Sequence, residues 1–345
     1  MRVLLVYNTD YDAELMEASP ADVSAVREAA LAVAAGVDGA GHGCEVLGIG
    51  GPDITTLMSR LKSDPPDLVF NLCESLAGNT KNEVVVPALL DLAGVAYTGP
   101  GPLAIGLCLH KDRTKDILVA RGVPTPPSVV LAGEADFAAA EAGNLAIDYP
   151  CFVKLCHEDA SVGIDETNVA ANPAALARRA RQLVAAYRQP VLAEAYVDGR
   201  EVNVTLMGNG DEVIALPLHE IDFSAMPAHR PRIVSYAAKW DPDHVDFGGT
   251  VPVPVTAMAP AQIAAVTEVA IAAYGALGLR DFGRVDVRIA KDGTPMVIDV
   301  NPNCDLSPDA GFARAAAAAG MSYADLVGRI CELASRRHAD LRHAA

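Results

Sequence analysis

Apolar positions in the first third of the chain form three short runs, and helix-like segments lie between and after them. The expected strands are 2–7, 44–49 and 67–72, and the expected helices are 23–35 and 84–93. Strands that alternate with helices are typical of a parallel α/β layer. Residues 97–102 are a cluster of turn-forming residues. We therefore predict an N-terminal parallel α/β domain at 1–103.

The rest of the chain mixes strands and helices in a less regular order, which predicts an α+β arrangement. Expected strands are 150–155, 190–197, 200–207, 284–289 and 296–301, and expected helices are 260–277, 312–319 and 322–335. The runs 190–197 and 200–207 flank Asp198-Gly199 and are predicted to form a hairpin. We expect a central domain at 104–190 and a C-terminal domain at 191–345.

The segment from Arg284 to Asn301 has the alternating pattern of a β-hairpin. Residues 292–293 are Asp-Gly, which favours a two-residue turn. That turn pairs Asp286 with Asp299, and Arg284 with Asn301, so that four polar groups share one face. Two opposed carboxylates repel each other unless a cation lies between them. Carboxylate and amide oxygens suit Mg²⁺ or Mn²⁺, which predicts a metal site here; the alternative is an ordinary solvated face.

A lysine on an expected strand is a second candidate for chemistry. Lys154 lies among apolar residues, where an unpaired charge is costly, so it needs an anionic partner or must reach solvent at the strand end. The turn-prone segment 158–163 follows and could close over a phosphate with its backbone N–H groups. Segment 227–243 lacks periodicity, and a long loop of this kind is more often functional than idle.

The composition, with 51% hydrophobic and 21% charged residues, is that of an ordinary globular protein. A net charge of −17 opposes binding to nucleic-acid phosphates, so we expect no nucleic-acid partner. The sequence shows neither a targeting segment nor a long apolar run, which predicts a cytoplasmic protein without a membrane partner. The seven cysteines lack paired spacing and are expected to be reduced thiols.

Together these motifs resemble the ATP-grasp carboxylate–amine ligases, and most closely the D-alanine–D-alanine ligase branch. Their order and spacing, from about residue 70 to residue 333, are more specific than any single motif. The matching segments are 97–99, 111–115, 152–154, 161–163, Glu194 with Glu201, 236–240, 283–286 and 299–301. The resemblance implies an ATP-grasp fold that follows the N-terminal α/β domain.

The resemblance also implies how this chain would bind ATP with two Mg²⁺ or Mn²⁺ ions. Phosphates would be contacted by Lys111 and Lys154 and covered by Ala160, Ser161, Val162 and Gly163. The adenine would be held at Glu194, Ala195, Tyr196 and Val197, and the ribose at Glu201. Lys239, beside Trp240 on a mobile loop, would reach the γ-phosphate. The metal ligands would be Asp286, Asp299 and Asn301, and Arg284 would stabilise charge that develops during the reaction.

Three segments depart from the D-alanine branch. The loop 8–14 lacks the small-residue Ser-x-Glu type segment, and Asn71-Leu72-Cys73-Glu74 stands in place of a His-Gly pair. After Asn301 the chain continues as the divergent segment 302–311, where that branch has a glycine and a serine for its oxyanion and second carboxylate. Asp305 in this segment would repel a carboxylate and attract an ammonium group. We expect substrate selection to involve Glu74, Asp305, Ser307 and Asp309.

We therefore predict an ATP-dependent ligase that joins an amino-acid-like carboxylate to an amine through an acyl phosphate and releases ADP and phosphate. Its substrates are expected to differ from two D-alanines. The alternatives are a D-alanine–D-alanine ligase proper, an ATP-grasp kinase, or a nucleotide-binding protein without turnover. The resemblance further implies small-molecule, amino-acid-like substrates and a homodimer.

Overall fold

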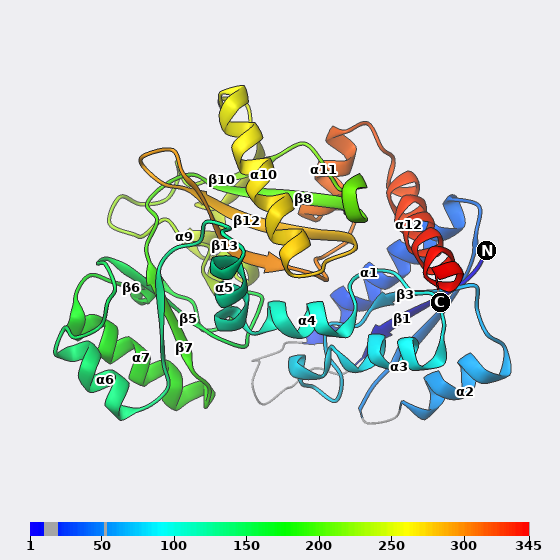
Figure 1. The fold of residues 1–345 in the computed structure, drawn as a ribbon, viewed down its shortest axis with the longest axis horizontal. Helices are drawn as coiled ribbons and strands as arrows, with labels where there is room; N and C mark the ends of the chain where they lie inside the picture. Colours follow the sequence, from blue (N-terminus) through cyan, green and yellow to red (C-terminus); the bar gives the residue numbers. More distant parts are fainter. Residues whose placement is uncertain (10–19, 52–53, 345) are drawn as a thin grey trace.

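The computed structural model describes residues 1–9, 20–51 and 54–344, which form three β-sheets. Figure 1 shows the N-terminal sheet at one end of the molecule, a four-stranded sheet at the other end, and the largest sheet between them. None of the helices in the described ranges is long and apolar enough to span a bilayer. Residues 10–14 of the substrate-loop prediction lie outside the described residues.

The N-terminal sheet is parallel, as predicted, with the order β2-β1-β3. Its strands are β1 (Arg2–Asn8), β2 (Gly43–Ile49) and β3 (Leu68–Leu72), and its helices are α1 (Pro20–Gly39), α2 (Thr55–Ser63) and α3 (Val85–Ala93). Val3 and Leu5 face one apolar core with α1, whereas Leu4 and Val6 face a second core with α2 and α3. The central strand β1 and its neighbour β3 are mostly apolar because both of their faces are covered, whereas the edge strand β2 includes Glu45 and is mostly exposed or half-buried.

The C-terminal helix α12 (Tyr323–Ala344) returns to this sheet and packs on α1. The two helices approach closely at glycines: a Cβ atom on Gly36 would lie 2.8 Å from Val327 Cγ2, and one on Gly328 would lie 2.8 Å from Ala40 Cβ. Both chain termini consequently lie at the same end of the molecule (Figure 1). The end of the predicted C-terminal domain is thus built into the N-terminal core.

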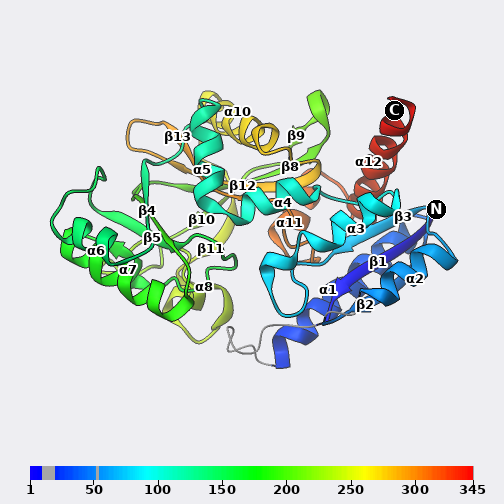
Figure 2. The ribbon, with the colours of Figure 1, turned by 60° about the horizontal axis from the view of Figure 1, so that its bottom comes forward.

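The four-stranded sheet is antiparallel and has the order β4-β7-β5-β6. It contains β4 (Ser128–Leu131), β5 (Cys151–Leu155), β6 (Val169–Ala170) and β7 (Val191–Ala195), and it shares an apolar core with α6 (Glu134–Glu141) and α7 (Pro173–Tyr187). Figure 2 shows both helices on one face of this sheet. The predicted domain limit at residue 190 lies inside the sheet, since β7 pairs with both β4 and β5.

The largest sheet is antiparallel, with the order β11-β10-β8-β12-β13 and with β9 beside β8. Its strands are β8 (Glu201–Gly208), β9 (Ile214–Ala215), β10 (His219–Asp222), β11 (Val251–Pro254), β12 (Asp281–Ile289) and β13 (Pro295–Asn301). Its apolar core includes residues of α4 (Pro102–Leu109), α5 (Lys111–Ala120) and α10 (Pro260–Ala276). Shorter elements are α8 (Tyr236–Trp240), α9 (Val245–Gly248), α11 (Gly311–Ala318) and the 3₁₀ turns Thr80–Asn82, Glu166–Asn168 and Gly210–Glu212.

The predicted hairpin of 190–197 with 200–207 is wrong, because β7 and β8 belong to different sheets. The chain crosses between the sheets at Gly199, where a Cβ atom would lie 1.8 Å from the Ile289 carbonyl oxygen. The Asp-Gly pair therefore serves a close backbone approach rather than a two-residue turn.

The hairpin of β12 and β13 has the predicted pairing at its polar end, with Asp286 opposite Asp299 and Arg284 opposite Asn301. The predicted two-residue turn is wrong, since the connection runs from residue 290 to residue 294. The pairing near this wider turn is displaced by one residue, and an irregularity beyond Asp286 restores it. A β-bulge of this kind is a common device beside functional sites.

We expect Gly36→Leu to lower the midpoint of thermal unfolding, because the new side chain would overlap Val327 and overpacking costs about 1–3 kcal/mol. Gly275→Ala in α10 is the matched control, since no atom lies within 4 Å of the added Cβ. This control should leave stability unchanged or raise it by up to about 1 kcal/mol. Equal midpoints for Gly36→Leu and wild type would contradict the close packing of α1 and α12.

Candidate active site

A cavity of about 480 Å³ lies where the four-stranded sheet meets the largest sheet. Its wall combines β5 and β7 with β8, β12 and β13, and it also includes part of α8 and the loop after β5. Fifteen of the predicted residues line it: Lys111, Lys154, Ala160, Ser161, Val162, Glu194, Ala195, Tyr196, Val197, Glu201, Lys239, Arg284, Asp286, Asp299 and Asn301. Gly163 and Trp240 lie beside it, whereas the four predicted substrate residues do not line it.

The polar end of the hairpin forms one wall of the cavity. Arg284 donates two hydrogen bonds to Asp286, at 2.8 and 2.9 Å, and Asn301 Nδ2 donates a third at 3.1 Å. Asn203, which lies opposite Asp286 on β8, donates a fourth at 2.7 Å. The strand pairing thus places every partner of this carboxylate on one face of the sheet.

Three buried lysines gather around Glu194 and the hairpin; Lys111 and Lys154 line the cavity, whereas Lys115 does not. Lys154 Nζ lies 3.1 Å from Glu194 and donates a hydrogen bond to the Ile298 carbonyl at 2.7 Å. Lys115 Nζ lies 2.7 Å from the other oxygen of Glu194, and Lys111 Nζ lies 2.7 Å from Asp159 and 3.3 Å from Asp299. Lys154 therefore has an anionic partner and does not reach solvent at the strand end, as its low exposure of 6% also shows.

The Glu194 carboxylate is enclosed between Lys115 and Lys154. Burial acts to raise the pKa of Glu194, but the two lysines lower it below its usual range. The structure thus gives this carboxylate a direct role in fixing both lysines. Its predicted contact with adenine stays a prediction.

A second buried ion pair lies at the far end of the cavity. Arg288 Nη2 lies 2.7 Å from Glu201, and Arg288 Nη1 donates a hydrogen bond to the Val197 carbonyl at 2.8 Å. The guanidinium carbon also lies 5.3 Å from the ring centre of Tyr196 and 5.7 Å from that of Phe223. Arg288 thus orients the predicted ribose ligand Glu201 and the predicted adenine segment together.

Two loops meet over the mouth of the cavity. The loop after β5 has left-handed backbone at Ala160 and Ser161, with φ angles of 55° and 62°. Ser161 Oγ donates a hydrogen bond to the Val234 carbonyl at 3.0 Å, and Trp240 Nε1 donates one to the Ala160 carbonyl at 3.2 Å. The predicted phosphate-covering loop and the helix that carries Lys239 are therefore joined to each other.

The charges in the cavity shift the pKa values of its groups in consistent directions. Burial acts to raise the pKa of Asp299, yet Lys111, Lys154 and Arg284 lower it. Burial acts to lower the pKa of Lys111, yet Asp159 and Asp299 raise it. Lys239 is accessible from the cavity, but the protein atoms around it, followed by the charge of Arg284, lower its pKa. Fixed positive charge thus surrounds the predicted metal carboxylates.

The predicted substrate residues gather beyond the hairpin. Asn303 Nδ2 donates hydrogen bonds to the Cys73 carbonyl and to Glu83, both at 3.1 Å, and so joins segment 302–311 to the turn after β3. Asp305 accepts hydrogen bonds from the backbone N–H and the hydroxyl of Ser307, at 2.8 and 2.6 Å. Asp309 is exposed, and its carbonyl accepts a hydrogen bond from Arg314.

Glu74 shares this region with Asp305. It is accessible to solvent, yet crowding by protein atoms, followed by the negative charges of Asp305 and Asp159, raises its pKa to about 7. Glu83 is buried, and its pKa lies well above the usual range because of burial and the charge of Asp159. The region is therefore acidic and partly protonated near neutral pH.

Several residues of the cavity wall were not predicted. Arg288 and Asn203 follow the same two-residue alternation as Arg284 and Glu201, so the strand pattern could have found them. Lys115 does not line the cavity but contacts Glu194, and its place one helical turn after Lys111 is also a usable signal. Asp159 and Arg314 also line the cavity and were not predicted. Asp159 lies in a loop and Arg314 in a helix, and no sequence periodicity marks either position as part of the site.

Comparisons with known proteins agree on one family. Residues 117–332 match the family described as "D-ala D-ala ligase C-terminus". The protein y4sG of Sinorhizobium fredii is 33% identical over 295 residues, which cover 83% of this chain and 81% of that protein. A D-alanine–D-alanine ligase of Ralstonia nicotianae is 33% identical over 267 residues, which cover 76% of this chain and 74% of that protein.

The fold is also that of a solved ligase. The crystal structure of a D-alanine–D-alanine ligase from Bacillus anthracis complexed with ATP has a TM-score of 0.74 to this chain, with 20% sequence identity and 99% coverage of each chain. This similarity confirms the predicted fold class, an ATP-grasp fold with an N-terminal parallel α/β domain.

The fold and the cavity define an ATP-grasp ligase. The family match, together with relatives at 33% identity, shows that the chain belongs to the D-Ala–D-Ala ligase C-terminal family and is an ATP-dependent carboxylate–amine ligase. ATP and Mg²⁺ are the cofactors of ligases in this class.

The donor set on the hairpin fits a hard divalent cation. Asp286 and Asp299 lie directly opposite each other, and Asn301 adds an amide beside them. Two carboxylates and an amide oxygen are ligands that Mg²⁺ accepts. Arg284 contacts Asp286 and Lys111 contacts Asp299. These side chains neutralise part of the negative charge that a bound metal ion would also neutralise.

We expect Asp299→Ala to weaken binding of ATP with Mg²⁺ and to lower the rate of ADP formation by about 100-fold or more, since it removes a predicted metal ligand. The control is Asp292→Ala in the turn of the same hairpin, where the side chain is exposed. Binding can be followed by the fluorescence of Trp240, the single tryptophan of the chain. An Asp299→Ala activity within a few-fold of wild type at saturating Mg²⁺ would refute the metal assignment.

We expect Glu194→Gln to lower the free energy of unfolding by about 3–5 kcal/mol, because two buried lysines lose their shared counter-charge. Urea unfolding measures this change, and Glu45→Gln, in an exposed ion pair with Arg60, should change little. The folded-state pKa of Glu194 is lowered, so its stabilisation is present above the unfolded pKa and is lost as pH falls through the folded value. The difference between wild type and Glu194→Gln should therefore shrink in acid, and a difference independent of pH would contradict this account.

Proposed function

We propose that this chain forms an amide or peptide bond between an amino-acid-like carboxylate and an amine other than the D-alanine pair. The observation that carries the ligase chemistry is the set of fixed cations, Lys111, Lys154 and Arg284, around the facing carboxylates Asp286 and Asp299. Such a set neutralises the repulsion between a carboxylate substrate and a triphosphate, which would keep them apart in water.

The first step is phosphoryl transfer. A carboxylate oxygen of the acid substrate attacks the γ-phosphorus of ATP, the bond to the β–γ bridging oxygen breaks, and ADP leaves. Lys111 and Lys154 hold the phosphates, and Lys239 approaches the transferred group from α8. Asp286, Asp299 and Asn301 would hold the divalent ions, of which we propose two, and these would supply charge neutralisation at the phosphates.

The second step is acyl transfer. The amine nitrogen attacks the carbonyl carbon of the acyl phosphate, and the oxyanion that forms is stabilised by Arg284. The carbon–oxygen bond to phosphate then breaks, phosphate leaves, and the proton of the attacking nitrogen passes to the departing phosphate or to water. The joined loops at Ala160 and Trp240 exclude water from the acyl phosphate, which would otherwise hydrolyse.

The acidic region beyond the hairpin supports a substrate with a cationic group. Glu74 and Asp305 lie close enough for the charge of Asp305 to raise the pKa of Glu74. Two carboxyl groups would repel the carboxylate of an amino acid and attract an ammonium or guanidinium group. We therefore place the cationic part of one substrate at Glu74 and Asp305. Ser307 and Asp309 are proposed to contact the same substrate.

Two other functions remain specific alternatives. The relatives named D-alanine–D-alanine ligase support turnover of D-alanine, and a kinase would use the same lysines and carboxylates. A ligase releases phosphate only when a nucleophile is present, whereas a kinase leaves a stable phosphorylated product. A homodimer, which the family resemblance implies, is part of the proposal.

The proposed function is tested by measuring ADP and phosphate release with Mg²⁺ over a panel of amino acids, each with and without a second amine. We expect stoichiometric ADP and phosphate only with an acid–amine pair that includes a basic side chain or diamine. Turnover of D-alanine comparable to that of a dedicated ligase would overturn the substrate assignment. ADP without phosphate would indicate a kinase.

The pH dependence of the same reaction tests the acidic region. Glu74, with a pKa of about 7, is a carboxylate above neutral pH and neutral below it. The KM for the cationic substrate should therefore rise as pH falls through 7, and Glu74→Gln should give a high KM that does not change over this range. A wild-type KM that is flat across neutral pH would remove Glu74 from the substrate site.

A further inference from the structure

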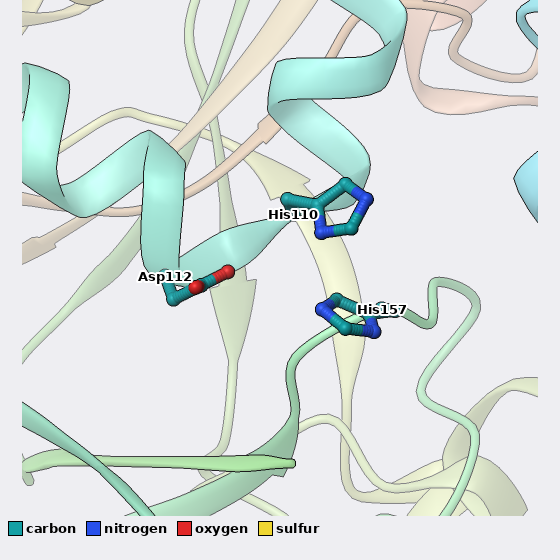
Figure 3. A group of neighbouring side chains, drawn as sticks. All are labelled: His110, Asp112 and His157. Carbon is teal, nitrogen blue, oxygen red and sulfur yellow. The ribbon is translucent and has the colours of Figure 1, made fainter. Parts of the chain in front are cut away.

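Two histidines and an aspartate form a cluster outside the catalytic cavity. His110, Asp112 and His157 each offer a ligand atom, and these atoms all lie within 4.8 Å of one another. Figure 3 shows the two imidazole rings facing each other, with the carboxylate beside them. The ring centres are 4.2 Å apart and the rings are tilted by 58°, so they are not stacked face to face.

The backbone around the cluster is fixed from both sides. His110 lies between α4 and α5, and its carbonyl accepts a hydrogen bond from Thr114 N at 2.9 Å. Lys111 N donates a hydrogen bond to the Cys156 carbonyl at 2.9 Å, which holds the two histidine-bearing segments together. His157 N donates to Gln189 Oε1 at 2.9 Å. The cluster is thus assembled by tertiary contacts, as a metal site requires.

The side chains themselves have few competing partners. Asp112 Oδ1 is buried without a hydrogen-bond partner among the described residues, and Oδ2 lies 3.5 Å from the neighbouring Arg113. No described residue forms a hydrogen bond with a ring nitrogen of His110 or His157.

We propose that His110, Asp112 and His157 bind a divalent transition-metal ion of the Zn²⁺ type. Two imidazoles and one carboxylate are ligands that Zn²⁺, Co²⁺ and Ni²⁺ prefer, whereas Mg²⁺ prefers oxygen. In tetrahedral zinc sites the ligand atoms lie about 3.3 Å apart. The ligand atoms of this cluster lie within 4.8 Å of one another, and small side-chain rotations can bring them to that spacing. One coordination position remains for water. Asp112 offsets the repulsion that Lys81 and Lys111 exert on the ion.

The site lies next to the catalytic machinery but is separate from it. The metal would tie the residue before Lys111 to the start of the loop 158–163 that is predicted to cover the phosphates. Bound metal would therefore stiffen both segments of the nucleotide site. The inference is independent of the identity of the ligase substrates, because metal binding can be measured without turnover.

The test is a calorimetric titration of Zn²⁺ into the full, tag-free chain after chelator treatment, with Mg²⁺ at saturation so that the hairpin carboxylates are occupied. We expect one Zn²⁺ per chain and a rise in the thermal midpoint. His110→Gln, His157→Gln and Asp112→Asn should each weaken binding by about 10-fold or more. His229→Gln, at an exposed histidine outside the cluster, should behave like wild type.

A second readout identifies the ligands. Co²⁺ in a tetrahedral site with two imidazoles gives strong visible absorption, which His157→Gln should abolish and His229→Gln should keep. ATP binding, measured by Trp240 fluorescence, checks that each variant is folded. If a histidine variant does not fold, the Zn²⁺ affinity of Asp112→Asn tests the proposal instead. Absence of Zn²⁺ binding by wild type, or wild-type affinity in folded variants of the cluster, would overturn the proposal.

Discussion

The structure depends on a buried network of charge in which Glu194 joins Lys115 to Lys154, and Asp299 contacts Lys111. These residues come from α5, β5, β7 and β13, so the network forms only when the four-stranded sheet and the largest sheet come together. Buried charges without partners are strongly unfavourable. The same network that fixes the two sheets therefore places the lysines that are predicted to contact the triphosphate.

Closure of the cavity relies on connections of a different kind. Arg288 ties Glu201 to the end of β7 through its ion pair and its bond to Val197, and Trp240 ties α8 to the loop after β5. The first connection is buried, whereas Trp240 is 47% exposed. Exposed contacts open more easily than buried ion pairs, so the structure combines a fixed nucleotide wall with a cover suited to opening.

The predicted substrate residues lie against the N-terminal unit, and none of the described residues of that unit lines the cavity. Asn303 bonds to Cys73 and Glu83 and brings the segment after the hairpin against the turn after β3. The C-terminal helix α12 packs on α1 and shares the apolar core of the N-terminal unit. The residues predicted to contact phosphate and those predicted to contact substrate thus lie in different parts of the fold.

The sequence alone indicated the parallel N-terminal layer, because β1 and β3 are covered on both faces and are mostly apolar. The pairing of Asp286 with Asp299 was predicted from a two-residue turn that the structure does not have. The pairing holds because an irregularity just beyond Asp286, in the same hairpin, compensates for the wider turn, and the sequence pattern does not reveal this irregularity. Only the tertiary structure placed Glu194 between two lysines, separated β7 from β8, and brought His110 to His157. Those contacts join residues far apart in the chain, and local patterns carry no information about which distant charges share a buried site.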